Sequence, residues 1–340
     1  MNIATISAKL AAGETLSAEE RKFLDDHLAT QSAAAAGAGQ PTPQGAAKID
    51  LSALTPEARE AVVDLLEQGL ARQSAEVGAA PVRVAALGGE DPAALIQRAK
   101  ELGASAVQTF LGDPQSWNAP SGYPVEELSE LVATSGIDLY IHAPYVINVA
   151  TTNNKVRIPS RKLLAFTMKY AQRAGAKGVI VHGGHVQSGD DLSIGYANWA
   201  KALAEVAELT IPVFIENTAG GERAMARTLS SLDGLWKVIK EFNPGFCLDT
   251  CHAHAAGLSM DSLVSDITEI TGGISLVHAN GSRDEAGSGR DRHANFDDGL
   301  LPGEVVVDVI KKANAPAIIE TPEEKHMSDL QFLRDKLGIS

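Results

Sequence analysis

From residue 82 onward, short apolar runs rich in β-branched residues alternate with longer stretches whose apolar residues recur at helical spacing. This alternation is typical of βα units, in which helices connect parallel strands. Eight such runs match the eight units of a (β/α)8 barrel of about 250 residues, whereas a doubly wound sheet more often has about five or six strands. We therefore predict an α/β fold, a (β/α)8 TIM barrel, over residues 82–340. The predicted strands are Val82–Leu87, Ala106–Phe110, Asp138–His142, Gly178–His182, Ile211–Glu216, Gly245–Asp249, Ile274–His278 and Ala315–Glu320.

The N-terminal part of the chain, residues 1–81, differs from the rest in composition and in the pattern of its apolar residues. Apolar residues at helical spacing and the capping box Ser17–Glu20 predict a helical hairpin over residues 1–30. Residues 31–48 are rich in Ala, Gly, Gln and Pro and have no large apolar side chain, so we expect a flexible linker. An apolar stripe predicts a helical extension over residues 49–81. The barrel is thus expected to carry a small helical N-terminal extension.

The composition is that of an ordinary globular protein, with 44% apolar and 21% charged residues. No run approaches the roughly 18 apolar residues of a membrane-spanning helix, and the N-terminus has no basic segment followed by an apolar one. We therefore expect a cytoplasmic, intracellular protein without a signal peptide or a membrane partner. The two cysteines, Cys247 and Cys251, are four positions apart. This spacing indicates neither a disulfide framework nor a Cys-x-x-Cys zinc motif, so we interpret them as small thiols near the core.

Six of the predicted strands end on a side chain that can bind a metal ion. A single His or Glu at a strand end is more often a hydrogen-bonding residue, but here six consecutive strands share the feature. Because the carboxyl ends of barrel strands open on one face, side chains far apart in the sequence meet there. Imidazole nitrogens and carboxylate oxygens suit Zn²⁺ or Mn²⁺. The six residues are His142, His182, Glu216, Asp249, His278 and Glu320.

Three more candidate ligands lie in loops. His252 follows Asp249 by three positions, and Asp291 and His293 stand two apart in a polar, glycine-rich segment after the seventh strand. Because a loop lets side chains converge, Asp291 and His293 can bind one ion together, and with His252 they make an Asp/His2 set. These residues extend the predicted metal site beyond the strand ends.

Five segments that contain these residues resemble motifs of the endonuclease IV family, whose members are zinc-dependent apurinic/apyrimidinic endonucleases with a TIM-barrel fold. The resemblance extends over essentially all of residues 82–340. It implies hydrolysis of the DNA phosphodiester 5′ to an abasic site, which leaves a 3′-OH end, in base excision repair. The implied partner is double-stranded DNA with abasic sites. The segments are His-Ala-Pro-Tyr-Val-Ile-Asn at 142–148, Ile-Glu-Asn-Thr-Ala-Gly-Gly at 215–221, Leu-Asp-Thr-Cys-His-Ala at 248–253, Asp-Arg-His at 291–293 and Ile-Glu-Thr at 319–321.

The resemblance also implies ligands for three zinc ions in each chain, with Mn²⁺ as an alternative metal. Glu216 would bridge the first two ions, and we assign catalytic roles to Glu216 and Glu320. The first two ions would acidify a shared water molecule, and the third would stabilise the leaving oxygen. The implied sets are His142, His182 and Glu216 for the first ion, Glu216, Asp249, His278 and Glu320 for the second, and His252, Asp291 and His293 for the third.

Tyr145 and Gln115 are the expected contacts to DNA. Tyr145 matches a residue that wedges into the DNA stack in the family. Gln115 stands where the family often places an Arg that enters the DNA. Ala85 replaces a usual His on the first strand, and Gly281 replaces a usual Asp after the seventh. These differences concern the grip on DNA and the choice of lesion rather than the metal ligands.

The net charge of −14 at pH 7 argues at first against a nucleic-acid partner, because phosphate binding normally uses an excess of Lys and Arg. Bound divalent ions would offset this negative charge locally, since they can be the largest charges in a site. An acidic chain is therefore compatible with a DNA substrate if the predicted metal site is filled.

The main alternative is a sugar isomerase or epimerase of the xylose-isomerase-like barrels. Those enzymes use one or two metal ions, and they have no use for the other five candidate ligands as a set, so we favour the endonuclease. A third alternative, a non-catalytic DNA-associated or structural protein, does not explain a complete ligand set. The isomerase site would correspond to Glu216, Asp249, His278 and Glu320.

Overall fold

The structure is a computed structural model that describes residues 82–85, 91–119 and 122–339. The helical hairpin, linker and helical extension predicted for residues 1–81 lie outside the described residues, as do the last two residues of the first predicted strand. Within the described ranges, no helix combines the length and the apolar content needed to cross a membrane.

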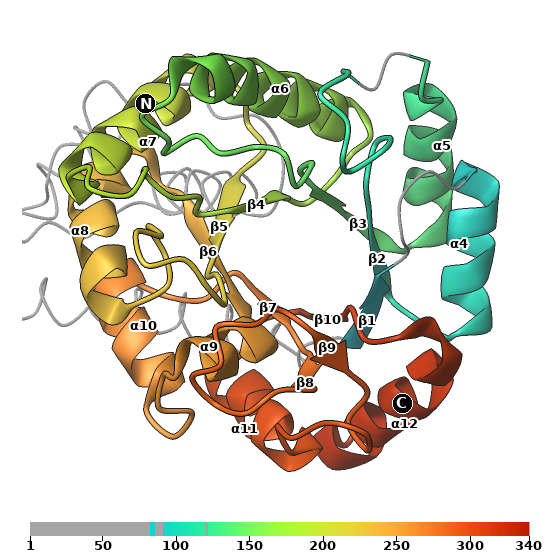
Figure 1. The fold of residues 1–340 in the computed structure, drawn as a ribbon. Coiled ribbons are helices and arrows are strands. Elements are labelled where there is room, and N and C mark those ends of the chain that lie inside the picture. Colours follow the sequence, from blue (N-terminus) through green and yellow to red (C-terminus); the bar gives the residue numbers. More distant parts are fainter. Residues whose placement is uncertain (1–81, 86–90, 120–121, 340) are drawn as a thin grey trace, which may run out of the picture. The chain divides into compact units, whose positions relative to one another are not determined.

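Eight parallel strands close into a barrel in the order β1-β10-β7-β6-β5-β4-β3-β2 (Figure 1). Each strand pairs with the strands that precede and follow it in the barrel, and β1 closes the ring by pairing with β10. The predicted (β/α)8 TIM barrel is thereby confirmed. The strands are β1 Val82–Ala85, β2 Ala106–Thr109, β3 Asp138–His142, β4 Val179–His182, β5 Val213–Glu216, β6 Gly245–Asp249, β7 Leu276–His278 and β10 Ala317–Ile319.

Four strands, β4, β5, β7 and β10, begin later than their apolar runs predict, and a proline directly precedes two of them. β5 begins at Val213 after Pro212, and β10 begins at Ala317 after Pro316. Proline has no N–H to donate to a strand ladder. Its carbonyl still contributes, because Pro212 accepts from the N–H of Val179 at 3.0 Å. The sequence therefore predicts the C-terminal ends of the strands, which carry the site, better than their beginnings.

Helices surround the barrel on its outside (Figure 1). Asp91, Asn153 and Asp191 accept hydrogen bonds at the N-termini of α4, α6 and α7, and Thr228 forms a capping box with Ser231 at the start of α8. Such caps satisfy backbone N–H groups that have no partner inside the helix. The helices are α4 Pro92–Glu101, α5 Val125–Ser135, α6 Asn154–Arg173, α7 Leu192–Glu205, α8 Leu229–Ile239, α9 Thr250–Ala256, α10 Leu263–Thr271, α11 Gly303–Ala313 and α12 His326–Leu337, with short 3-10 helices η2 Lys240–Phe242 and η3 Glu323–Lys325.

The core has two parts, because side chains alternate between the two faces of each strand. The larger part lies between the strands and the helices and includes Trp199, whose Nε1 donates to the carbonyl of Gly183 at 2.7 Å. The smaller part is a layer inside the barrel, to which β2, β3, β4, β5, β6, β7 and β10 contribute one residue each. The members of this inner layer are Ala106, Tyr140, Ile180, Phe214, Cys247, Leu276 and Ile318.

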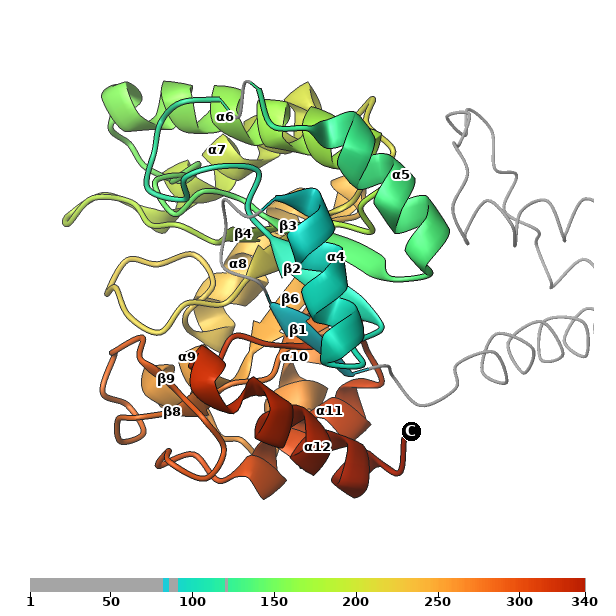
Figure 2. The ribbon, with the colours of Figure 1, turned by 90° about the vertical axis from the view of Figure 1, so that its right-hand side faces the viewer.

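A short hairpin crosses the C-terminal face of the barrel. β8 Gly281–Ser282 pairs antiparallel with β9 His293–Ala294. A Cβ at Gly281 would lie 2.7 Å from the carbonyl oxygen of Ala294, so the glycine permits the close pairing. The hairpin and the loops after β4 and β5 project from the same side of the barrel, at the left of Figure 2. This arrangement brings the segment 291–293 over the strand ends.

Candidate metal centre

Six strand ends supply a ring of buried or half-buried polar side chains directly above the inner apolar layer. On each of these strands the polar residue follows a member of that layer by two positions, so both point into the barrel. Neighbours in the sheet confirm the alignment, because His182 is in register with Glu216 and Asp249 with His278. The strand ends predicted from the sequence therefore meet on one face. They are His142, His182, Glu216, Asp249, His278 and Glu320.

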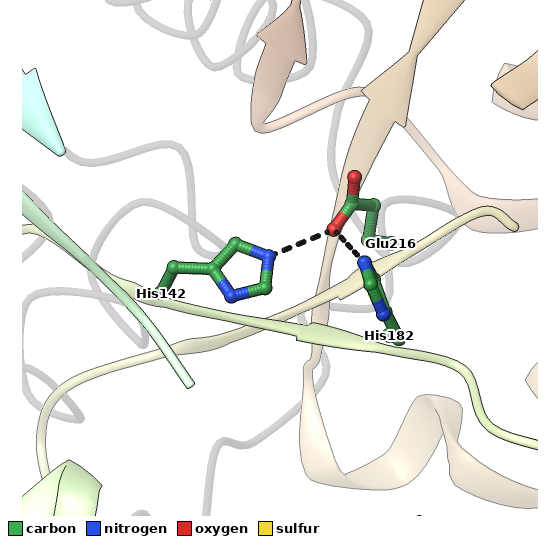
Figure 3. Close-up of side chains that lie close together, drawn as sticks. All are labelled: His142, His182 and Glu216. Carbon is green, nitrogen blue, oxygen red and sulfur yellow. Dashed lines mark hydrogen bonds and ion pairs between the residues drawn. The ribbon is translucent and has the colours of Figure 1, made fainter. Parts of the chain in front are cut away.

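Glu216 lies at the centre of this ring and is almost completely buried. Its Oε2 atom is 3.2 Å from Nε2 of His142 and 3.3 Å from Nε2 of His182 (Figure 3). Its Oε1 atom faces the other way, 3.0 Å from Nδ1 of His278. The two oxygens of one carboxylate thus belong to two different groups of candidate ligands, which is the geometry that a bridging ligand requires.

The second group surrounds Nδ1 of His278. This nitrogen lies 3.2 Å from Oε2 of Glu320 and 4.0 Å from Oδ2 of Asp249, in addition to its contact with Glu216. The four ligand atoms lie within 4.8 Å of one another. One imidazole and three carboxylates in so small a volume match the donor set expected for Zn²⁺ or Mn²⁺.

The third group forms where α9 meets the β8–β9 hairpin. Nε2 of His252 lies 3.1 Å from Oδ2 of Asp291, and Nε2 of His293 lies 3.1 Å from Oδ1 of the same residue. The three residues that the sequence analysis placed in loops are therefore neighbours, although His252 lies in α9 and His293 in β9. Two further groups of candidate ligands overlap with this one. Asp249, which we predicted for the second ion, groups with His252 and His293, and Cys251, which we did not predict as a ligand, groups with Asp291 and His293.

The spacing of Asp249 and His252 has a local cause. Asp249 is the N-cap of α9, and its Oδ1 accepts from the backbone N–H of His252 at 2.7 Å. An N-cap side chain commonly bonds the N–H of the third helical residue. The cap therefore fixes the backbone of His252 in the first turn of α9. It leaves Oδ2 of Asp249 directed toward His278.

The imidazoles of the third group have the chemistry of metal ligands. Nδ1 of His252 donates to the carbonyl of Asn217 at 2.9 Å, and Nδ1 of His293 donates to the carbonyl of Glu320 at 3.1 Å. A carbonyl can only accept, so in the neutral rings the Nε2 atoms carry lone pairs. Both Nε2 atoms are buried, and the Asp291 oxygens 3.1 Å from them are acceptors that cannot pair with a lone pair, so in the neutral rings neither atom has a hydrogen-bond partner. A cation held with Asp291 would satisfy both, because a buried polar atom without a partner is costly.

Two asparagines that the sequence interpretation did not single out hold the acidic ligands. Asn217 accepts from the N–H of Asp249 at 2.7 Å and donates to its carbonyl at 2.9 Å. Asn280 donates to Oδ2 of Asp249 at 2.6 Å and accepts from the N–H of Glu320 at 2.7 Å. Their positions, one after Glu216 and two after His278, were a usable signal. Such contacts fix the orientation of carboxylates that bind metals.

Charges in the centre are strongly coupled. Burial alone raises the pKa of Glu216, but the charge of His278 and other imidazoles outweighs it and holds the pKa well below its usual value. For Asp249 burial dominates, and its pKa is raised. Burial opposes protonation of His293, yet the neighbouring carboxylates of Asp291 and Asp249 raise its pKa to about 9. A potential negative enough to keep buried imidazoles protonated also favours divalent cations.

The two predicted DNA contacts lie in neighbouring loops at the rim. The N–H of Tyr145 donates to the carbonyl of Pro114 at 2.8 Å, which joins its loop to the one that carries Gln115. Tyr145 is 49% exposed, and its ring stacks on His182 with the centroids 5.7 Å apart. Gln115 is exposed. Both side chains are therefore accessible, and Tyr145 lies beside the candidate ligands His142 and His182.

The fold and the site together define a metal-binding enzyme of the TIM-barrel class, and the family model described as "Xylose isomerase-like TIM barrel" matches residues 96–336. Two relatives are each described as "Probable endonuclease 4". The protein of Mycobacterium marinum is 51% identical over 249 residues, which are 73% of this chain and 96% of the relative. That of Mycobacterium tuberculosis is 50% identical over 236 residues, 69% of this chain and 92% of the relative. The chain belongs to the endonuclease IV family of metal-dependent apurinic/apyrimidinic endonucleases.

Solved structures share the barrel fold, and one of them is an endonuclease IV. Endonuclease IV from Thermus thermophilus is 26% identical, with a TM-score of 0.65 over 76% of this chain and 99% of that chain. A D-tagatose 3-epimerase-like protein shares the fold at 20% identity, with a TM-score of 0.62 over 76% of this chain and 97% of that chain. The predicted family and its nuclease function in DNA repair are confirmed by the relatives at about half identity.

Proposed function

We propose that this endonuclease binds three Zn²⁺ ions and hydrolyses the phosphodiester 5′ to an abasic site in double-stranded DNA, leaving a 3′-OH end. The observation that carries the proposal is the orientation of Glu216, whose two oxygens face two separate groups of ligands. Because the proposed substrate is cellular DNA, we also propose an intracellular location. The proposed ligands are His142, His182 and Glu216, then Glu216, Asp249, His278 and Glu320, and then His252, Asp291 and His293.

Bound zinc ions would supply positive charge that acidifies water and stabilises the oxyanions of an in-line displacement at phosphorus. The chain's own residues would set where that charge lies. Glu216 would hold the first two sites at a fixed separation, and Asn280 would keep Asp249 and Glu320 turned toward the second. Asp291 would hold the third site between His252 and His293.

Two residues at the rim of the barrel, Tyr145 and Gln115, would contact the DNA substrate. The exposed ring of Tyr145 lies directly beside His142 and His182, so a base step next to the lesion can reach the ring while the phosphate approaches the ligands. Gln115 offers an amide rather than a guanidinium, so we propose that it contacts DNA by hydrogen bonds without adding positive charge.

A duplex that contains a tetrahydrofuran abasic analogue tests the reaction. This analogue cannot undergo β-elimination, so we expect the protein to nick it and to leave a 3′-OH end that a DNA polymerase extends. The measurement is gel analysis of the nicked strand before and after extension. Activity only on natural abasic sites, with an unsaturated aldehyde at the 3′ end, would indicate a lyase and contradict hydrolysis.

Metal content separates the endonuclease site from an isomerase-like site. We expect about three zinc ions per chain in protein purified without chelator, because three groups of ligands are present. Elemental analysis against protein concentration gives the ratio. A ratio of two or less, retained with full nicking activity, would contradict the proposal, because at least one of the three groups would then not hold a metal.

A further inference from the structure

Gln108 occupies on β2 the position that the candidate ligands occupy on the other strands. Ala106 is the β2 member of the inner apolar layer, and Gln108 follows it by two positions. It therefore points into the same ring as His142, which follows Tyr140 by two on β3. β2 thus contributes an amide to the ring, where each of the six strands described above contributes an imidazole or a carboxylate.

The amide of Gln108 bridges two residues of the second group. Its side chain is 2% exposed. Its carbonyl Oε1 lies 2.8 Å from Nε2 of His278, and its Nε2 donates to Oε1 of Glu320 at 2.7 Å. These contacts join β2 to β7 and to the end of β10, so they are made only in the closed barrel.

The orientation of this amide follows from the role of His278. Nδ1 of His278 faces the carboxylates of Glu216 and Glu320, so Nδ1 is the nitrogen available to a metal. Nε2 must then carry the ring hydrogen, and Oε1 of Gln108 accepts it. A flipped amide would place two donors against each other. The two hydrogen bonds of Gln108 therefore require one tautomer of His278.

His278 differs in this respect from three other imidazoles of the centre. His142, His252 and His293 each donate from Nδ1 to a backbone carbonyl, of Ala143, Asn217 and Glu320 respectively. Those acceptors are backbone carbonyls, so they remain in place whichever side chain the acceptor residue carries. For His278 the acceptor is the side chain of Gln108, so this contact can be removed by a substitution.

We propose that Gln108 is a positioning residue that holds the metal-binding tautomer of His278 and turns Glu320 toward the second metal site. Asn280 donates to the other oxygen of Glu320 at 3.2 Å, so the carboxylate lies between two amides. The inference rests on the proposed ligand set. Contacts of this kind to a ligand typically change metal affinity by roughly 10- to 100-fold.

The test compares Gln108→Met with Thr109→Val in the zinc-loaded full chain. Methionine keeps the length of the side chain and removes both hydrogen bonds. Thr109 is the next residue of β2, is equally buried, and its hydroxyl donates to the carbonyl of Phe110. Equilibrium competition with a zinc chelator is expected to show one of the three ions held roughly 10- to 100-fold more weakly in Gln108→Met. The other two ions, and all three in Thr109→Val, should keep the affinity of the wild type.

Kinetics on the tetrahydrofuran duplex supply a second measurement. We expect a lower kcat in Gln108→Met at saturating zinc, with KM within about twofold, because the residue touches ligands and not DNA. Gln108→Glu keeps an acceptor for His278 and loses only the amide donor to Glu320, so its zinc affinity should fall at least about threefold but less than that of Gln108→Met. If Gln108→Met is insoluble, the zinc affinity of Gln108→Glu is the deciding measurement.

Unchanged zinc affinity in the Gln108 variants, or an equal loss in Thr109→Val, would overturn the inference while leaving the proposed function intact. A wild-type chain that holds no zinc through His278 and Glu320 would instead overturn the ligand set, and the inference with it. The two failures are distinguished by the zinc content of the wild type.

Discussion

Glu216→Gln is expected to abolish turnover, with kcat reduced at least about 1,000-fold, a loss of about 4 kcal/mol of transition-state stabilisation. The carboxylate lies between His142 and His182 on one oxygen and His278 on the other. Glutamine keeps the shape but offers one neutral oxygen and an N–H donor, so it cannot serve two cations. Single-turnover rates on the tetrahydrofuran duplex, with zinc content measured in parallel, give the loss.

His293→Ala should cost less than Glu216→Gln, because its site keeps His252 and Asp291, with Asp249 close by. Glu222→Gln is the matched control, since it makes the same substitution at an exposed residue in the segment that follows β5. We expect the control to retain kcat within about twofold. A loss in His293→Ala that equals or exceeds the loss in Glu216→Gln would contradict the central role of Glu216.

Removal of zinc is expected to lower the melting temperature by roughly 5–10 °C. Glu216, Asp249 and His278 are almost completely inaccessible to solvent, and without cations their charges must be balanced within the protein. A site filled at a free metal concentration of about 100 times Kd contributes about 2.7 kcal/mol of stability. For a domain of this size, each kcal/mol corresponds to about 2–4 °C.

Calorimetry of chelator-treated protein, before and after dialysis and return of zinc, measures this effect. The control is the same chelator saturated with zinc beforehand, which removes no metal from the protein. Nicking activity should be lost and regained together with the shift. Equal melting temperatures in the treated and zinc-returned samples would show that the buried carboxylates and imidazoles need no metal for the stability of the fold.

Much of the site could be predicted from the sequence because a parallel barrel maps strand ends onto one face. β3 and β6 begin and end at the residues that the apolar runs predict, and each ends on a candidate ligand, His142 and Asp249. Once the fold is a barrel, no knowledge of side-chain conformation is needed to bring such residues together. The Asp-x-x-His spacing of Asp249 and His252 is also local, since a helix cap produces it.

Gln108 is a residue of the site that we did not predict from the sequence. The apolar run of β2 continues to Phe110, so its polar residue lies inside the run and not at its end. The alternation of Ala106 and Gln108 within the run was the available signal. Its meaning depends on which face of β2 points into the barrel, and that is decided by pairing with β1 and β3.

The sequence by itself determined the barrel, the strand ends and the chemical identity of the candidate ligands, because alternation and spacing along the chain express them directly. Only the tertiary structure decided how the ligands are shared. The division of the Glu216 oxygens between two groups and the use of Nδ1 in His278 depend on side chains from strands far apart in the sequence. The approach of His293 to Asp291 and Asp249 also depends on tertiary structure, because the pairing of β8 with β9 produces it. These contacts are set by barrel closure and by packing. Neither can be predicted from a local pattern along the chain.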